Sequence, residues 1–180
     1  MKLDIIQALL SPHRPADASE ADSLRRILEL IAGRGNPFSR QHFVPGHLTA
    51  SGIVLDEKRE RTLLIFHSKL KRWLQPGGHF EPGENDPSVA AAREVLEETA
   101  MATRWPGSAP VLLDADVHEI PARKTEPAHF HFDLRMLLIA EEGEVKAVEV
   151  AEARWVHPSE FGALDLDPGL QRALKKVSLL

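Results

Sequence analysis

The alternation of hydrophobic and polar positions predicts a series of strands with helices before, between and after them. Apolar residues at helical spacing predict two amphipathic helices at the start of the chain, over residues 2–10 and from the capping-box-like Ser19-x-x-Asp22 to Gly33. Period-two alternation predicts strands over residues 47–55, 62–67, 111–120 and 129–139, with shorter candidates at 145–150 and 153–156. The pair Asp167-Pro168 predicts the start of a final helix.

The strand predicted over residues 129–139 has one apolar and one polar face. Its polar face carries His129, His131, Asp133 and Arg135, and the strand before it carries Asp114, Asp116 and His118 on one side. These side chains form either the polar wall of a cleft or the solvated face of an edge hairpin. The clustered histidines favour the cleft, and His118, His129 and His131 could also bind a metal ion, although histidine more often forms only hydrogen bonds.

The most informative stretch runs from Pro76 to Met101, PGGHFEPGENDPSVAAAREVLEETAM. Asp86 and Pro87 suit the N-cap and first position of a helix that should end near Ala100. Three glutamates at spacing i, i+3 and i+4 share one helix face, and five residues are expected to pack on the opposite face: Val89, Ala92, Val95, Leu96 and Thr99. Like charges at this spacing repel. A hard divalent cation bound by Glu94, Glu97 and Glu98 would explain the arrangement.

The same stretch resembles the Nudix box, Gly-x5-Glu-x7-Arg-Glu-U-x-Glu-Glu-x-Gly-U, where U is a bulky aliphatic residue. Gly78 and Glu84 match its first half, and the run from Arg93 to Glu98 matches its second half. Two departures are visible, since eight residues rather than seven separate Glu84 from Arg93, and Ala100 replaces the closing glycine. Neither removes a metal ligand. If the helix ends in the left-handed conformation, alanine at position 100 destabilises that end by about 1 kcal/mol relative to glycine, or else the helix ends at a different residue.

The resemblance implies an α/β fold, a Nudix-type α/β/α sandwich around a mixed sheet. We expect a single domain over residues 1–180 with an N-terminal helical extension over residues 1–35. The resemblance further implies Mg²⁺ or Mn²⁺ bound by the Gly78 carbonyl, Glu94, Glu97 and Glu98. Glu97 or Glu98 would orient or deprotonate the attacking water, and Glu84 and Arg93 would form a supporting ion pair. A downstream carboxylate often joins such a site, and the candidates are Glu119, Glu126, Glu149 and Glu152.

The implied reaction is hydrolysis of a diphosphate linkage in a nucleoside diphosphate joined to another moiety. Candidate substrate contacts are Lys69, Arg72, His79, His131 and Arg135. The basic segment that includes Lys69 and Arg72 could meet phosphates, or it could be a solvated turn with Trp73 as a core anchor. Specificity in such proteins comes from surrounding loops, so the motif does not determine the substrate.

Composition narrows the function classes. The 180 residues are 43% hydrophobic and 27% charged, with a net charge of −5, which argues against a nucleic-acid-coating surface. A nucleotide substrate stays compatible, because a bound metal inverts the local charge of an acidic site. No cysteine is present, which excludes disulfides and thiol nucleophiles. The chain has neither a membrane-spanning apolar run nor a signal peptide, so we expect a cytoplasmic protein. The two N-terminal helices cover the core or a partner subunit, and a homodimer is compatible with that.

Two alternatives differ in class from a metal-dependent hydrolase. A catalytically silent nucleotide-binding module or regulator would be marked by lost box carboxylates, and none is lost. An isomerase of the isopentenyl diphosphate type resembles this fold, but its chemistry relies on a cysteine that this chain lacks. The hydrolase is therefore the preferred prediction.

Overall fold

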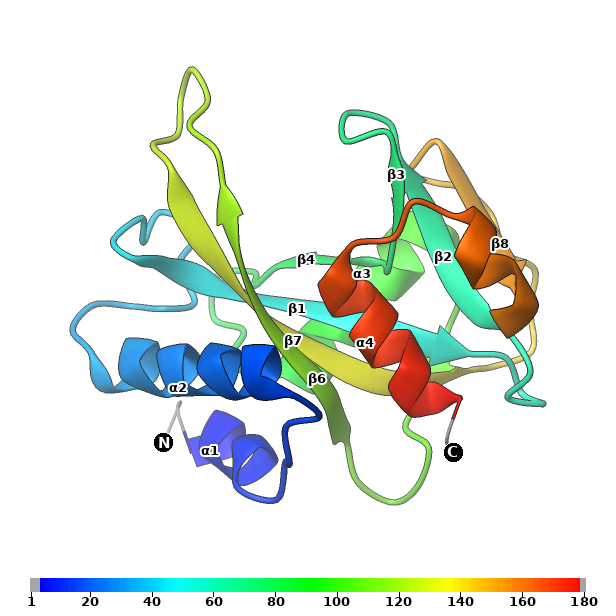
Figure 1. Ribbon diagram of the computed structural model, residues 1–180, viewed down its shortest axis with the longest axis horizontal. Coiled ribbons are helices and arrows are strands. Elements are labelled where there is room, and N and C mark those ends of the chain that lie inside the picture. Colours follow the sequence, from blue (N-terminus) through cyan, green and yellow to red (C-terminus); the bar gives the residue numbers. More distant parts are fainter. Residues whose placement is uncertain (1–3, 179–180) are drawn as a thin grey trace.

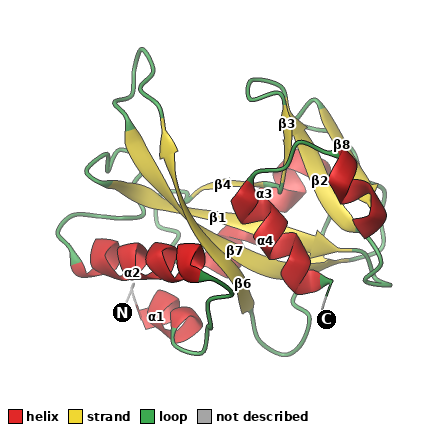
Figure 2. Cartoon of the chain, viewed as in Figure 1, coloured by secondary structure: helices red, strands yellow, loops and turns green. Residues whose placement is uncertain are grey.

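A computed structural model describes residues 4–178 and shows a curled, mixed β-sheet with helices on both sides (Figure 1; Figure 2). This architecture confirms the predicted α/β class. The elements in chain order are α1 (Asp4–Leu10), α2 (Ala18–Ala32), β1 (Gly46–Leu55), β2 (Thr62–His67), β3 (Arg72–Leu74), β4 (Gly77–His79), α3 (Pro87–Thr99), β5 (Thr103–Arg104), β6 (Val111–Ile120), β7 (His129–Ala140), β8 (Glu152–Val156), the 3-10 helix η1 (Pro158–Ala163) and α4 (Pro168–Val177).

The centre of the sheet is the parallel pair of β1 and β7. Their register runs without interruption from Gly46 opposite Phe130 to Leu55 opposite Ile139. The main strand order is β3-β2-β1-β7-β5, and β4, β6 and β8 pair antiparallel with β1, β7 and β2. The central pairing brings residues about 84 positions apart side by side, for example His47 beside His131.

Two hydrophobic clusters hold the helices on the sheet. One joins α1, α2 and α3 to the sheet face that carries Leu48, Ala50 and Leu134. The other packs α4 against the opposite face, where Ile53 and Leu137 lie. In Figure 1, α4 accordingly lies in front of the sheet and α3 behind it. Alternate residues of a strand point to opposite faces, so the period-two pattern of β1 and β7 divides their side chains between the two clusters.

Two predicted features need correction, and a third lies partly outside the described residues. Residues 145–150 form no strand but an irregular segment, whose Lys146 and Val148 amides donate to the carbonyls of Thr99 and Glu98 at the end of α3. The N-cap of α2 is Asp17, whose side chain accepts from the Glu20 amide, so Ser19 is already helical. The predicted helix over 2–10 is described only from Asp4, since residues 2–3 lie outside the described range.

Between residues 4 and 178, none of the helices combines the length and the apolar character that a membrane crossing requires.

Candidate active site

Helix α3 begins and ends as its sequence predicts. Asp86 caps it by accepting from the Ser88 amide, and Pro87 occupies the first turn. At its end Ala100 has φ 54° and ψ 16°, the left-handed conformation that favours glycine. The helix end is therefore retained without the glycine, and the backbone of Ala100 bears the strain.

The packing face of α3 differs from the predicted one. Val89 and Leu96 are 52% and 50% exposed, whereas Ala90, Ala91, Val95 and Thr99 are buried. The reason is close packing on β1, since a Cβ atom at Gly52 would lie 2.7 Å from a methyl group of Val95. Small residues therefore face the sheet. The helix is rotated so that Glu94 and Glu98 border the buried face instead of lying opposite it.

Glu94 and Glu98 lie against the short strand β4. A Cβ atom at Gly78 would come within 2.7 Å of the Glu94 carboxylate, so a larger residue at this position would displace that side chain. The amide of Gly77 donates to Oε2 of Glu98 at 3.0 Å. The glycine pair thus lets the backbone approach the two carboxylates directly.

Arg93 connects the acidic face to the loop before it. Its guanidinium donates to both oxygens of Glu84 at 2.9 Å and to the carbonyl of His79 at 2.8 Å. It also donates to Glu94 at 3.0 Å and to Glu97 at 2.9 Å. The ion pair with Glu84 that the motif implies is present, and it lowers the pKa of the Glu84 carboxyl. Arg93 therefore fixes the spacing between the loop and two of the three helix carboxylates.

The remaining carboxylate is electrostatically strained. Burial raises the pKa of Glu98 to about 7, and the charges of Glu94, Glu149 and Glu97 act in the same direction against the Gly77 hydrogen bond. Burial also raises the pKa of Glu94, with Arg93 opposing it. Crowded carboxylates beside an exposed backbone are what a hard divalent cation binds, so the residues present fit Mg²⁺ or Mn²⁺.

Among the downstream carboxylates, Glu149 lies near the acidic face. It raises the pKa of Glu98, and the Val148 amide beside it is bonded to the Glu98 carbonyl. The other candidates lie elsewhere: Glu126 pairs with Arg40 at 3.5 Å, Glu152 approaches Arg154 at 3.9 Å, and Glu119 lies on β6 opposite Phe130. Glu149 is therefore the downstream residue that the structure favours.

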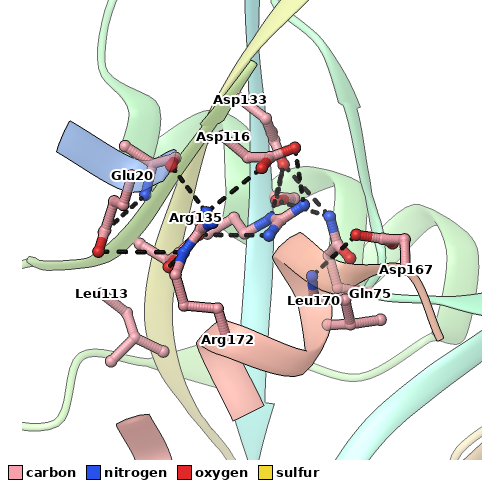
Figure 3. Close-up of polar contacts among 12 residues, drawn as sticks. Glu20, Gln75, Leu113, Asp116, Asp133, Arg135, Asp167, Leu170 and Arg172 are labelled. Atoms are coloured by element: carbon pink, nitrogen blue, oxygen red, sulfur yellow. Dashed lines mark hydrogen bonds and ion pairs between the residues drawn. The ribbon is translucent and has the colours of Figure 1, made fainter. Parts of the chain in front are cut away.

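The polar face of β6 and β7 is largely a buried charge network (Figure 3). Arg135 is only 2% exposed and contacts Asp114 and Asp133 at 3.2 Å and Asp116 at 3.4 Å. Arg172 of α4 donates to Asp114 from two nitrogens, at 2.8 and 2.9 Å. The expectation that Arg135 contacts substrate directly therefore needs correction, because its guanidinium is buried and forms ion pairs with these carboxylates.

The basic segment before the motif lies at the surface. Lys69 is exposed in the turn after β2, and Arg72 on β3 approaches Asp165 at 3.6 Å. Trp73 packs against the cluster under α4, with the Arg154 guanidinium 4.7 Å from its ring centroid. These contacts favour the interpretation of Trp73 as a core anchor.

Histidines gather on the same sheet face as the charge network. The rings of His79 and His131 lie 5.1 Å apart, and the ring of His47 lies 5.1 and 4.8 Å from them. The three histidines whose nitrogens converge are His47, His79 and His131, not the predicted set with His118 and His129. His47 could not be predicted as a member of the cluster, because only the pairing of β1 with β7 brings it beside His131.

Comparisons with known proteins agree with this geometry. The family model described as NUDIX domain matches residues 45–177. The chain is 31% identical over 135 residues to the probable DHNTP pyrophosphohydrolase of Lactococcus lactis subsp. cremoris (strain MG1363), a match that covers 74% of this chain and 78% of that protein. A NUDIX family hydrolase from Clostridium perfringens superposes with a TM-score of 0.57 at 22% identity, covering 78% of this chain and 98% of the other. The NUDIX domain of Shewanella oneidensis NrtR, solved with ADP-ribose, superposes with a TM-score of 0.53 at 14% identity, covering 83% and 97%.

The extent of the family match shows that the chain belongs to the Nudix family. Within the family it is a pyrophosphohydrolase, a hydrolase acting on acid anhydrides that cleaves pyrophosphate linkages. The predictions of family and of enzyme class are confirmed, and we set aside the silent module and the isomerase.

Proposed function

We propose that the enzyme depends on Mg²⁺ or Mn²⁺ and hydrolyses a diphosphate linkage in a nucleotide-type substrate, with DHNTP as the leading candidate. The observation that carries the metal dependence is the state of Glu98. Its carboxylate is half-buried, has a pKa raised to about 7, and takes part in no ion pair with any residue between 4 and 178. A divalent cation would provide the missing positive charge.

Four groups would hold the cation: the carboxylates of Glu94, Glu97 and Glu98 and the carbonyl of Gly78. When bound, the cation supplies charge neutralisation at the phosphoryl oxygens. The protein supplies positioning, since Arg93 holds Glu94 and Glu97 in place through hydrogen bonds of 3.0 and 2.9 Å. Glu149 would complete the acidic face from the segment that crosses the end of α3.

Glu98 is the stronger candidate for the group that accepts the proton of the attacking water. Arg93 donates to Glu97, and a hydrogen bond from a guanidinium lowers the basicity of a carboxylate. Among residues 4–178, the Glu98 carboxylate accepts a hydrogen bond only from the backbone amide of Gly77. The water would attack one phosphorus of the diphosphate linkage, and the other phosphoryl group would leave with the linking oxygen.

The proposal of DHNTP rests on the name of the Lactococcus lactis relative, which is 31% identical over most of both chains. The test is a substrate panel of DHNTP, ADP-ribose, a dinucleoside tetraphosphate and nucleoside triphosphates, each with Mg²⁺, Mn²⁺ or EDTA. Released phosphate, pyrophosphate and nucleotide would be quantified by chromatography. We expect DHNTP to give the highest kcat/KM, with turnover abolished by EDTA.

Two variants test the roles of the residues. Glu98→Gln should reduce kcat by orders of magnitude, because it removes the charge but keeps the shape. Val89→Ala, on an exposed part of the same helix, is the matched control and should keep wild-type turnover. Undiminished activity in EDTA would refute the metal dependence, and a clear preference for another panel member would refute DHNTP.

A further inference from the structure

Three imidazoles converge from three neighbouring strands. His47 lies on β1, His131 is its register partner on β7, and His79 ends β4 on the other side of β1. Their ring centroids form a triangle with sides of 4.8, 5.1 and 5.1 Å. One nitrogen from each ring lies within 4.8 Å of the others. The cluster therefore offers three nitrogen ligands from a rigid sheet.

The hydrogen bonding of His47 shows which nitrogen is free. Its Nδ1 lies 3.3 Å from the carbonyl oxygen of His42, and because a carbonyl only accepts, Nδ1 carries the hydrogen. In a neutral ring, Nε2 then has an open lone pair. His47 is only 1% exposed, and this Nε2 has no hydrogen-bond partner between residues 4 and 178. A buried acceptor without a partner costs free energy unless something binds it.

The donor atoms of the cluster determine which kind of metal ion it suits. Neutral imidazole is a ligand for borderline transition metals such as Zn²⁺, whereas Mg²⁺ prefers oxygen. The bond from the His42 carbonyl to Nδ1 also orients the ring, as partners outside the coordination sphere commonly do at histidine metal sites.

This cluster is separate from the acidic face of α3. The Cβ position of Gly78 points to Glu94, and alternate residues of a strand point to opposite faces, so the adjacent His79 points away from α3. A surface pocket of about 450 Å³ lies nearby, lined by Arg40, Gln41, Phe43, Thr125 and Glu126. The Phe43 ring is 6.4 Å from the ring of His47, so this pocket lies beside the cluster.

We propose that His47, His79 and His131 form a binding site for a borderline divalent transition-metal ion such as Zn²⁺ or Co²⁺. Zinc–nitrogen bonds measure about 2.0–2.1 Å, which places tetrahedral ligand nitrogens roughly 3.4 Å apart. The nitrogens, which lie within 4.8 Å of one another, must therefore approach by up to roughly 1.5 Å when the ion binds. Neither the His79 nor the His131 side chain forms a hydrogen bond to any residue in the described part of the chain, so turning either ring toward an ion breaks no such bond. Three protein ligands leave coordination positions for water or for substrate oxygen.

The test uses Co²⁺ as the probe, in the full-length protein without substrate. Visible absorption titration should show ligand-field bands that saturate at one equivalent and disappear when Zn²⁺ is added. His79→Gln and His131→Gln should each weaken Co²⁺ binding by more than about tenfold. Two controls should keep the bands: His118→Gln, whose ring lies 5.6 Å from that of His131 but outside the triad, and Glu98→Gln on the acidic face.

A second measurement does not depend on the folding of variants. In wild-type protein with ¹⁵N-labelled histidine, Zn²⁺ should shift the ring nitrogen resonances of three of the nine histidines. The shifted resonances should include that of Nε2 of His47. Co²⁺ binding that survives both triad variants, or that is lost in Glu98→Gln, would overturn the proposal. So would a wild-type spectrum in which Zn²⁺ leaves the histidine nitrogens unshifted.

Discussion

Replacing Glu98 by Gln should stabilise the metal-free protein at alkaline pH. Burial raises the pKa of this carboxyl from its ordinary value of 4.5 to about 7, so the folded protein favours the protonated form. The stability gained from protonation is fully present below pH 4.5 and is lost as the pH rises through 7. Glutamine resembles the protonated acid and can still accept from the Gly77 amide, so the variant avoids this loss.

The size of the effect follows from the shift. A rise from 4.5 to about 7 corresponds to at most roughly 3.5 kcal/mol, since each pKa unit is worth about 1.4 kcal/mol. The side chain is only partly buried, so we expect a gain of about 1–3 kcal/mol at pH 8, or a Tm increase of roughly 2–10 °C. Urea denaturation in EDTA at pH 8, 6 and 4.5 would measure it, and the gain should shrink towards the lowest pH.

Glu97→Gln is the matched control, because it removes the same charge from a side chain that is 45% exposed. Solvent screens an exposed charge, so this variant should change the free energy of unfolding by no more than about 1 kcal/mol. The reasoning would be refuted if Glu98→Gln were no more stable than wild type at pH 8, or if its advantage were as large at pH 4.5.

Three further changes test other parts of the structure. Asp114→Asn should lower the free energy of unfolding by about 3–5 kcal/mol in urea denaturation, because two buried guanidinium groups lose their shared charge partner. Ala100→Gly should raise it by up to about 1 kcal/mol by relieving the left-handed helix end, whereas Ala92→Gly within the helix should lower it by about 0.5–1 kcal/mol. Gly169→Ala should lower Tm in calorimetry, since its Cβ would lie 2.5 Å from an aspartate oxygen, while Gly162→Ala meets nothing within 4 Å and serves as control.

Each of these predictions has a contrary outcome. A loss below 1 kcal/mol in Asp114→Asn would mean that the network carries little of the stability. Destabilisation of Ala100→Gly comparable to that of Ala92→Gly would show that the helix end is not strained. Equal Tm values for the two glycine variants would show that the N-terminal turn of α4 can move away from the sheet.

The sequence predicted the elements whose signals are local. Alternation identified β6 over the observed residues, and the Asp-Pro pairs identified the starts of α3 and α4. The segment over residues 145–150 has an apolar pattern, but its Lys146 and Val148 amides bond to the end of α3 instead of to a strand. Pairing partners depend on tertiary structure, so local pattern alone could not exclude a strand there.

The candidate site likewise contains some residues that local spacing predicts and others whose positions depend on strand pairing. The three helix carboxylates follow from their spacing, because the spacing itself sets which residues share a helix face. The burial of Arg135 and the position of His47 depend on which strands are neighbours. The sequence contains the residues of both clusters but does not reveal that β1 and β7 are parallel partners.

The contacts of Glu20 bear on how much of the chain is needed for stable folding. The residue lies on α2, before the segment that matches the family, yet its fully buried carboxylate accepts from the Ala115 amide on β6 and from Lys176 on α4. A fragment starting at residue 45 would remove the acceptor of the Ala115 amide and one of the partners of Lys176, and it would leave an apolar flank of the sheet exposed to water. We therefore expect a protein truncated to the segment that matches the family model to aggregate and fold poorly, and we regard the leading helices as part of the enzyme's minimal folding unit.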